Sequence, residues 1–469
     1  MIERLGQIFT DAYRRFMPDA FVFAIVLTVI CALAAMIVMS SGFFEVLEAW
    51  YQGFWLLLEF GMQMVLLVIT GYSIALAPFL RRQIDKLAVH LKTPRQVYFF
   101  VTLTGTLLCL VSWGWIIITA VLARELALRV KGVHYPYLIA CVYCSFISWV
   151  TGLSSSIPLL LNTQDNFLIE AGILQETIPT GFTLGSTLNM AMLLSTVILV
   201  PTVMWLLRPG KATDKELTVM LEAGDTPKEI RSIAQEADAT RLPGEKAWSD
   251  RLNHSVVLQY LIALSGVIYL GMHFYSNGGD LNLNIMIFIF LMLGMLLHKT
   301  PMRYGISMKR ASSNVSAILF QFPFYAGIMG IMMYTGLARE LGELMAAYAS
   351  PDNFPVFAFL TGGLVNFAIP SAGGEFAVIG PSVLQAVNDL GISGDQTIPM
   401  IARSAMAIAY GESLSNLLQP FFLLLVIPVM AAGIKIQARD IMGFLVIPFM
   451  VFMCVQLLII YFWPLAWIN

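Results

Sequence analysis

The sequence predicts an all-α polytopic membrane protein with an inverted-topology repeat, two re-entrant hairpins and two interrupted helices. Three observations lead to this fold class. Hydrophobic residues make up 58% of the 469 positions and charged residues only 12%, with a mean hydropathy of +0.78, which is typical of helical membrane proteins. Gly, Ser and Pro break several of the apolar runs, and motifs at these breaks recur at one spacing. The formal net charge of −2 gives no indication of a nucleic-acid partner.

The segment Ile369-Pro370-Ser371-Ala372-Gly373-Gly374-Glu375-Phe376 interrupts apolar sequence in the second half of the chain. Its apolar flanks, residues 354–367 and 377–387, both fall short of the roughly 20 residues that a helix needs to cross the hydrocarbon core. Two short helices joined by this segment predict a re-entrant hairpin over residues 354–388. Irregular backbone at membrane depth is tolerated where it lines a polar cavity, and an ionisable residue there, Glu375, is a candidate for function.

Three further segments are broken in the same way. A second hairpin is predicted over residues 97–130, where Ser112-Trp113-Gly114-Trp115 separates two apolar arms. One span, residues 135–161, is interrupted between Thr151 and Pro158, and another, residues 399–432, between Tyr410 and Pro420. Uninterrupted spans are predicted at residues 19–40, 54–80, 184–207, 255–275, 283–298, 311–335 and 441–463. The first of these is longer than a signal-peptide core and has no clear cleavage site, so we expect it to be retained.

Basic residues predict the orientation in the membrane. Loops that contain Lys and Arg lie around residues 1–15, 81–95, 124–131, 208–251, 299–310 and 435–439, and the positive-inside rule puts them in the cytoplasm. All of them fit at once if both hairpins are re-entrant, the first from the cytoplasm and the second from the outer face. The N-terminus is then cytoplasmic and the C-terminus outside. Residues 209–254, the only long charged region, are expected to be a cytoplasmic linker between a first half, 1–208, and a second half, 255–469.

The two halves match at a constant offset. Ser112-x-Gly114 matches Ser371-x-Gly373 (371 − 112 = 259), Gly152-x-Ser154-x-Ser156 matches Gly411-x-Ser413-x-Ser415, and Gly71 matches Gly330. Since the two hairpins enter from opposite faces, the repeat is predicted to be inverted, as in many secondary transporters. Both hairpin tips and both interrupted helices are then expected to meet around a substrate near the bilayer midplane.

The broken segments supply the candidate site residues. Hydroxyl groups and backbone amides at half-helix ends suit a substrate carboxylate; the candidates are Ser112, Gly114, Ser154, Ser155, Ser156, Ser371, Gly373, Gly374, Ser413 and Asn416. Cation coupling is predicted at Glu375, Glu412 and Ser415, because Ile116 and Leu153 stand at the positions of the first half that match the two glutamates. The structural alternative is that Glu375 and Glu412 pair with Arg403 or with backbone and hold the fold. Arg403 could equally contact an anion.

Other function classes find no support. The chain has no P-loop motif G-x-x-x-x-G-K-[ST] and no H-E-x-x-H motif, and Gly152-Leu153-Ser154-Ser155-Ser156 lacks the second Gly of G-x-S-x-G. An ATP-driven pump and an intramembrane enzyme are therefore not expected. Cys141 and Cys144 have C-x-x-C spacing, but no other cysteine or nearby histidine completes a metal site. We expect no cofactor and no metal other than Na⁺ as a coupling ion.

At these motifs the sequence resembles the bacterial short-chain fatty acid transporter family. The likeness is carried by Met17-Pro18-Asp19-Ala20-Phe21, Ser112-Trp113-Gly114 and residues 366–376 and 410–420, and it extends over essentially the whole chain. The sequence is similar, more distantly, to the superfamily of sodium-coupled dicarboxylate carriers, although the Ser-Asn-Thr tips of those carriers are absent. The resemblance implies uptake of short monocarboxylates such as butyrate or acetoacetate, a homodimer, elevator-type movement and a location in the bacterial inner membrane.

The sequence thus predicts a secondary active transporter of small carboxylates, driven by Na⁺ or H⁺. Two alternatives stay open: a carrier of other small carboxylates such as dicarboxylates, and a passive facilitator or channel. The expected partners are the carboxylate substrate, membrane lipid and a second copy of the chain.

Overall fold

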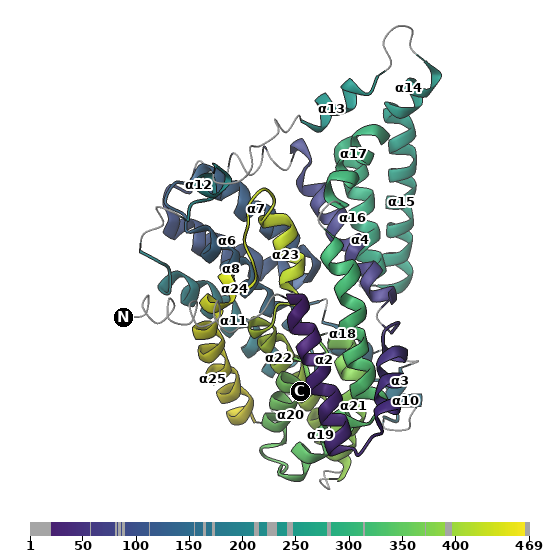
Figure 1. Cartoon of the computed structure of the whole chain (residues 1–469), viewed down its shortest axis with the longest axis vertical. Coiled ribbons are helices and arrows are strands. Elements are labelled where there is room, and N and C mark those ends of the chain that lie inside the picture. Colours follow the sequence, from purple (N-terminus) through teal and green to yellow (C-terminus); the bar gives the residue numbers. More distant parts are fainter. Residues whose placement is uncertain are drawn as a thin grey trace.

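The computed structural model describes residues 20–464, apart from 57, 80–81, 83–85, 87–89, 112, 154, 163–165, 171–173, 211–214, 223–231, 242–246, 279–282, 313–314, 371 and 390–395. Every regular element among these residues is a helix (Figure 1). Six of the helices are long and apolar enough to cross a membrane, and a seventh span is added if α22 and α23, bent by 44° at their junction, are counted as one. The prediction of an all-α membrane protein with several spans is confirmed.

The helices of the first half begin with α2 (Ala20–Val38), the short α3 (Phe43–Gly53) and α4 (Leu58–Ala75). Next come α6 (Pro94–Val111), a 3₁₀ turn (Trp113–Trp115) and α7 (Ile116–Arg129), where a hairpin is predicted. The first interrupted span consists of α8 (Tyr135–Ser145), a 3₁₀ helix (Phe146–Thr151) and α9 (Ser156–Leu161), and the half ends with α10 (Phe167–Glu170), a 3₁₀ turn (Thr180–Phe182) and α11 (Thr187–Leu206). Because α6 alone is long enough to cross a membrane, the re-entrant path of this hairpin stays a prediction.

The linker contains three short helices, α12 (Leu217–Glu222), α13 (Ile233–Ala239) and α14 (Trp248–Asn253). The second half begins with α15 (Val256–Asn277), α16 (Leu283–His298), α17 (Pro301–Ser312) and α18 (Ser316–Tyr334). It continues with α19 (Leu337–Ala347), α20 (Phe354–Val365), α21 (Ala372–Asp389), α22 (Thr397–Ser415), a 3₁₀ turn (Asn416–Leu418) and α23 (Leu423–Met430). The chain ends with α24 (Arg439–Met442), a 3₁₀ turn (Gly443–Leu445) and α25 (Val446–Phe462).

Two helices in this half differ from the sequence expectation. Residues 299–310, which were expected to form a basic loop, lie almost entirely in α17, and residues 337–347 form a helix for which no span or arm was predicted. Both helices are amphipathic rather than uniformly apolar, because α17 ends in Lys309 and Arg310 and α19 carries Arg339, Glu340 and Glu343. A hydropathy pattern that finds spans does not register short helices of this kind.

The helix boundaries repeat at the same offset of 259 residues as the motifs. Adding 259 to the bounds of α4 gives 317–334, against Ser316–Tyr334 for α18, and adding it to α11 gives 446–465, against Val446–Phe462 for α25. The short helix α3 corresponds in the same way to α17, and α6 to α20. The repeat therefore extends from single motifs to the order and length of the elements.

The two halves exchange contacts with each other. Helix α3 packs on α18, and its counterpart α17 packs on α4; likewise α2 packs on α18 and α16 on α4. The backbones of α3 and α18 nearly touch, since a Cβ added to Gly53 would lie 2.4 Å from the Cα of Gly330. Gly71, the sequence match of Gly330, lies instead against side chains of Ile117 and Phe290. The paired elements therefore match, although not every paired glycine has the same surroundings.

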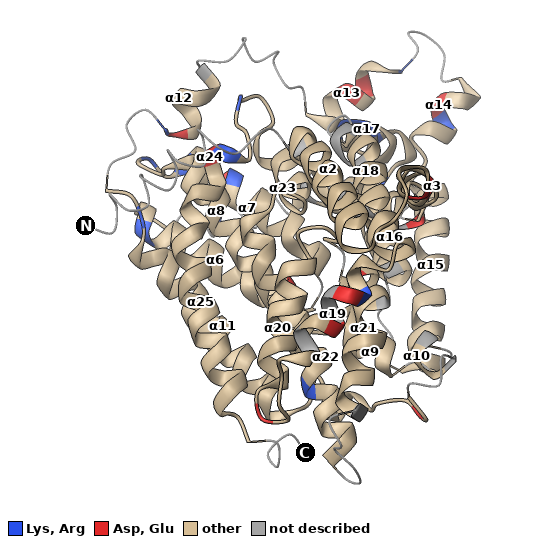
Figure 2. Ribbon diagram, turned by 60° about the horizontal axis from the view of Figure 1, so that its bottom comes forward, with Lys and Arg blue, Asp and Glu red and all other residues tan. Residues whose placement is uncertain are grey.

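Charged residues are distributed unevenly along the long axis. Figure 2 shows Lys and Arg gathered mainly at the end of the molecule where α12, α14, α17 and α24 lie. Helix α25 runs from this end, beside α24, toward the opposite end (Figures 1 and 2). The two ends of the helix bundle therefore differ in charge.

Candidate functional site

Helix α22 carries the second break into the interior of the protein. Every residue from Pro399 to Ser415 is buried, and the helix is followed by a 3₁₀ turn and then by Gln419 in an extended conformation (φ −128°, ψ 152°). Pro420 accounts for this ending, because a proline disfavours the helical conformation of the preceding residue and has no N–H to continue the ladder. The break therefore lies where the sequence predicts it.

Two glycines allow the interrupted spans to pack closely on the hairpin arms. A Cβ at Gly411 would lie 1.9 Å from the carbonyl oxygen of Phe359 in α20, and a Cβ at Gly152 would lie 2.1 Å from the carbonyl oxygen of Leu110 in α6. Neither contact leaves room for a side chain. In the first half the backbones also bond, as Leu153 N donates to Leu110 O at 2.7 Å. The matched glycines thus hold each break against the hairpin of its own half.

Glu412 is fully buried and has one side-chain partner. Asn416 Nδ2 donates to Glu412 Oε1 at 3.1 Å, and Glu412 Oε2 accepts no hydrogen bond from the described residues. No ion pair within the described chain involves Glu412. Arg403 lies on the same helix, but its Nη2 donates to the carbonyl oxygen of Ile460 in α25. The arginine is therefore directed away from the glutamate that it was considered to neutralise.

Asn366 connects the hairpin to the break. It follows the last residue of α20, is completely buried, and its Nδ2 lies 3.0 Å from Glu412 O, 2.7 Å from Ser415 Oγ and 3.0 Å from Asn416 Oδ1. An amide nitrogen has two hydrogens, so these three acceptors compete for them. Asn366 was not among the candidate residues. The sequence feature that could have identified it is a polar amide between an apolar hairpin arm and Ile369-Pro370.

Gln419 and Tyr143 complete the polar cluster and were also missed. Gln419 Nε2 donates to Asn416 Oδ1 at 2.7 Å and to Asn366 O at 3.3 Å. Tyr143 of α8 donates through its hydroxyl to Asn416 O at 2.8 Å and to Gln419 O at 3.1 Å. Both carbonyl groups are at the helix break, where Asn416 O also accepts from Gln419 N at 3.3 Å, and Tyr143 adds a donor in a buried region where polar backbone groups need partners. The first interrupted span therefore supports the second one.

Two predicted serines of the second half, Ser413 and Ser415, are part of this cluster. Ser413 Oγ donates to Ile147 O at 3.0 Å, in the 3₁₀ helix of the first break. Ser415 Oγ donates to Glu412 O at 3.0 Å and accepts from Asn366. Ser413 thus links the two halves, and Ser415 lies beside Glu412 as the cation prediction requires.

Glu375 lies in the first turn of α21, where the partial positive charge at the start of a helix favours an anion. It is fully buried, and neither carboxyl oxygen has a hydrogen-bond partner among the described residues. Its charge interacts with that of Glu412, so the two carboxyl groups are neighbours. A Cβ at Gly373, two residues earlier, would meet nothing within 4 Å, so the backbone at this tip borders open space.

The cluster is rich in acceptor atoms that lack donors. Within this cluster, the oxygens that have no partner among the described residues are Glu375 Oε1 and Oε2, Glu412 Oε2, Asn366 Oδ1 and Gln419 Oε1. Carboxylate and amide oxygens are ligands of hard cations, and a buried carboxylate is unfavourable unless a positive charge or a proton accompanies it. The arrangement suits binding of a proton or a small cation.

The candidate residues of the first half are only partly described. Ser112 and Ser154 lie outside the described residues, as does Ser371 of the second half. Gly114 is buried in the 3₁₀ turn between α6 and α7. Ser155 is buried and its Oγ has no partner among the described residues, while Ser156 starts α9 and is half-buried. Since α9 packs on both α21 and α22, these serines and the glutamates come from elements that touch.

No group of three His, Cys, Asp or Glu side chains able to hold a metal occurs in the described parts of the chain. Cys141 and Cys144 lie buried in α8, both as free cysteines. A Na⁺ site is compatible with this finding, because amide, hydroxyl and carbonyl oxygens supply ligands that such a group does not include.

Comparison with known proteins identifies relatives over the full length. The family model described as short chain fatty acid transporter matches residues 1–463. A Haemophilus influenzae protein described as a candidate short-chain fatty acid transporter is 35% identical over 449 residues, which are 95% of this chain and 96% of that protein. An Escherichia coli protein with the same description is 35% identical over 448 residues, with the same coverage.

Two solved structures are similar at low identity. Neisseria gonorrhoeae MtrF, whose report concerns a class of antimetabolite efflux pumps, has 15% identity, a TM-score of 0.42 and 97% coverage of both chains. The Alcanivorax borkumensis YdaH transporter has 14% identity, a TM-score of 0.39 and 86% coverage of both. Likenesses this low carry no argument about the function or the site.

Proposed function

Since the chain belongs to the short-chain fatty acid transporter family, we propose that it is a secondary active transporter that takes up butyrate-like monocarboxylates together with Na⁺ or H⁺. Membership confirms the resemblance of the motifs and the prediction of a membrane transporter rather than an enzyme. The substrate class follows the description of the family and of its relatives. Coupling is our inference from the site.

The observation that carries the coupling proposal is the pair of buried glutamates. Glu375 and Glu412 interact electrostatically, are fully buried and have no basic partner among the described residues. Two neighbouring negative charges in a low-dielectric interior would repel strongly. At least one positive charge, either a proton or a metal cation, must therefore accompany them, and its binding from one side of the membrane couples transport to an ion gradient.

The substrate is proposed to bind beside this cation site, between the hairpin tip and the first break. Gly373 borders open space, the start of α21 favours an anion, and Ser155 has a hydroxyl without a partner among the described residues. A carboxylate held there would lie near the coupling cation, which makes binding of the two mutually favourable.

Orientation and movement complete the proposal. The end of the molecule where Lys and Arg gather (Figure 2) is expected to face the cytoplasm of a bacterial inner membrane. The crossed packing of α3 with α18 and of α17 with α4 suits a scaffold of inverted halves, against which the hairpins and interrupted helices would move as an elevator. A homodimer built on this scaffold is part of the proposal.

The decisive experiment is butyrate uptake into proteoliposomes that hold the purified full-length protein, with an inward Na⁺ gradient or an inward pH gradient imposed separately. Accumulation above equilibrium under one gradient is expected and identifies the coupling cation. Equilibration without accumulation under both would favour the runner-up function, a passive facilitator, and succinate in place of butyrate tests the alternative of a dicarboxylate carrier.

A further inference from the structure

A cavity of about 410 Å³ opens between α22, α25 and the loop that precedes α20. It is separate from the glutamate cluster, because Arg403 precedes Glu412 by nine residues and so lies roughly 13 Å from it along the helix axis. The cavity is at the end of α25 that is remote from the basic end of the molecule (Figures 1 and 2). In the orientation proposed above, this is the outer end.

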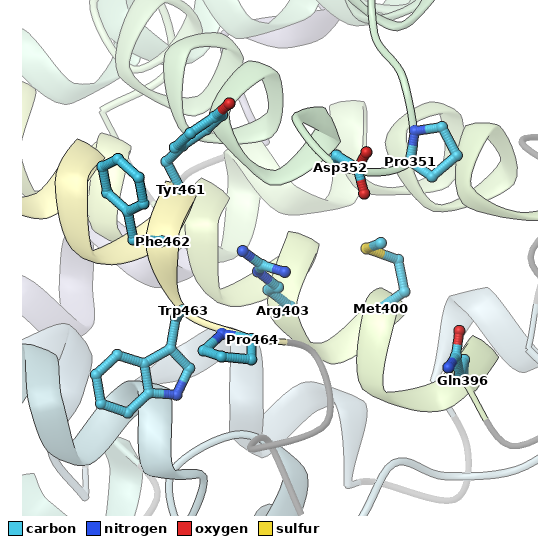
Figure 3. A pocket seen from close by; sticks show the side chains of 9 residues that line it. All are labelled: Pro351, Asp352, Gln396, Met400, Arg403, Tyr461, Phe462, Trp463 and Pro464. Carbon is cyan, nitrogen blue, oxygen red and sulfur yellow. The ribbon is translucent and has the colours of Figure 1, made fainter.

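A buried guanidinium group points into this cavity (Figure 3). Arg403 is only 5% exposed. Its Nη2 donates to Ile460 O, and its Nε has no acceptor among the described residues. Burying a charged group without its full set of partners is unfavourable. An arginine in this state has donors left for a ligand, and its planar fork matches a carboxylate.

Residues at the end of α25 line one side of the cavity, and Asp352 lies on the other. Met400 lies beside the guanidinium group in Figure 3, whereas the rings of Phe462 and Trp463 are directed away from it; Phe462 is 70% exposed, and Trp463 Nε1 donates to Thr187 Oγ1 in α11. Asp352, across the cavity, interacts with Arg403 through its charge but forms no ion pair with it. An inorganic anion would gain nothing from Met400, whereas a short alkyl chain packed against this side chain would be removed from water.

We infer that this cavity binds a short-chain monocarboxylate at the outer end of the protein, with Arg403 holding the carboxylate and Met400 packing against the alkyl chain. The identity of the ligand rests on the proposed function; the cavity and its buried guanidinium group do not. The cavity is a second binding site, outside the glutamate cluster.

The test uses the full-length protein in lipid nanodiscs with 5-fluorotryptophan in place of its nine tryptophans and follows the ¹⁹F resonance of Trp463 during titration with butyrate. The W463F variant assigns that resonance by its loss. We expect a saturable shift whose midpoint rises roughly tenfold in Arg403→Gln, since a charge-assisted hydrogen bond is removed. The midpoint should fall about threefold in Asp352→Asn, because a like charge near the ligand is removed.

The matched control is Arg339→Gln, which removes an exposed arginine whose Nε lies 3.5 Å from Glu343; its midpoint should equal that of the wild type. If Arg403→Gln does not fold, Asp352→Asn and Arg403→Lys decide. The inference would be overturned if the Trp463 resonance showed no saturable shift with butyrate. It would also be overturned if the titration midpoint were unchanged both in Asp352→Asn and in the Arg403 variant that folds, Arg403→Gln or Arg403→Lys. An equal shift with sulfate would overturn the assignment to a monocarboxylate.

Uptake by the same preparations separates this inference from the proposed function. An Arg403-dependent Trp463 shift without uptake by the wild type would keep the binding site and reject the transport proposal. Uptake without a Trp463 shift would keep transport and reject the site.

Discussion

Gly411 of α22 lies so close to Phe359 of α20 that a Cβ on the glycine would be 1.9 Å from the phenylalanine carbonyl oxygen. Gly411 is one residue before Glu412, and Phe359 is on the arm that ends at Asn366. The contact therefore sets the distance between the two sides of the polar cluster.

Gly411→Ala should prevent this approach. A methyl group cannot occupy the position without moving backbone, and overpacking typically costs about 1–3 kcal/mol, occasionally more. We expect a large fall in the Tm of the purified protein and loss of uptake. The control is Gly271→Ala in α15, where a Cβ would meet nothing within 4 Å and where alanine should be neutral or slightly stabilising. Equal Tm values for the two variants would contradict the contact.

Glu412→Gln should abolish gradient-driven accumulation while the protein stays folded. The glutamine keeps an oxygen that can accept from Asn416 Nδ2 but carries no charge for a cation to neutralise. We expect at least a tenfold loss of accumulation with little change in Tm. Glu48→Gln, at an exposed position where Gln52 is the partner, is the control. Wild-type accumulation by Glu412→Gln would remove this residue from the coupling mechanism.

Asn366→Ala should loosen the connection between the hairpin and the break. The amide has two hydrogens for three buried acceptors within 3.0 Å, and each hydrogen bond that is lost costs about 0.5–1.5 kcal/mol. Both Tm and uptake should fall, whereas Asn277→Ala, which removes an exposed amide bonded to His273, should change neither. A stable, active Asn366→Ala protein would mean that the cluster does not depend on this amide.

Ser155→Ala tests whether the Ser155 hydroxyl stabilises the fold or binds the substrate. Because Ser155 Oγ has no partner among the described residues, its removal should leave Tm unchanged or slightly raised. If the hydroxyl contacts the substrate, KM for butyrate should rise about tenfold. Ser265→Ala, which removes an exposed hydroxyl bonded to Leu261 O, gives the reference. An unchanged KM in both variants would place the substrate elsewhere.

Gly373→Ala tests the open space at the hairpin tip. The added methyl group meets no described atom within 4 Å, so thermal stability should not change. If the substrate occupies that space, the methyl group should raise KM by about threefold or more while the Tm stays constant. A wild-type KM would show that the space is not used by the substrate.

The positions of the breaks could be predicted from the sequence because Gly, Ser and Pro alter backbone propensity locally. The apolar runs likewise predict α4, α11 and α18 to within five residues at each end. The polar cluster could be predicted only in part: Glu412, Ser413, Ser415 and Asn416 lie in one break, but Asn366, Tyr143 and Gln419 join it through packing between elements distant in the chain. Arg403 shows the same limit, since its sequence position does not reveal that its guanidinium group points toward α25 rather than toward Glu412.

The near contact of Gly53 with Gly330 has a consequence for assembly. A short helix of each half, α3 or α17, packs on a long helix of the other half, α18 or α4. Neither half therefore has a complete interior when it is alone. We expect that a chain severed within residues 211–214 would still yield a working protein when both fragments are synthesised together, and that either fragment by itself would be degraded. The charged linker then ensures that the two halves are synthesised in equal number. The packing between their helices, more than the linker, holds the two halves together.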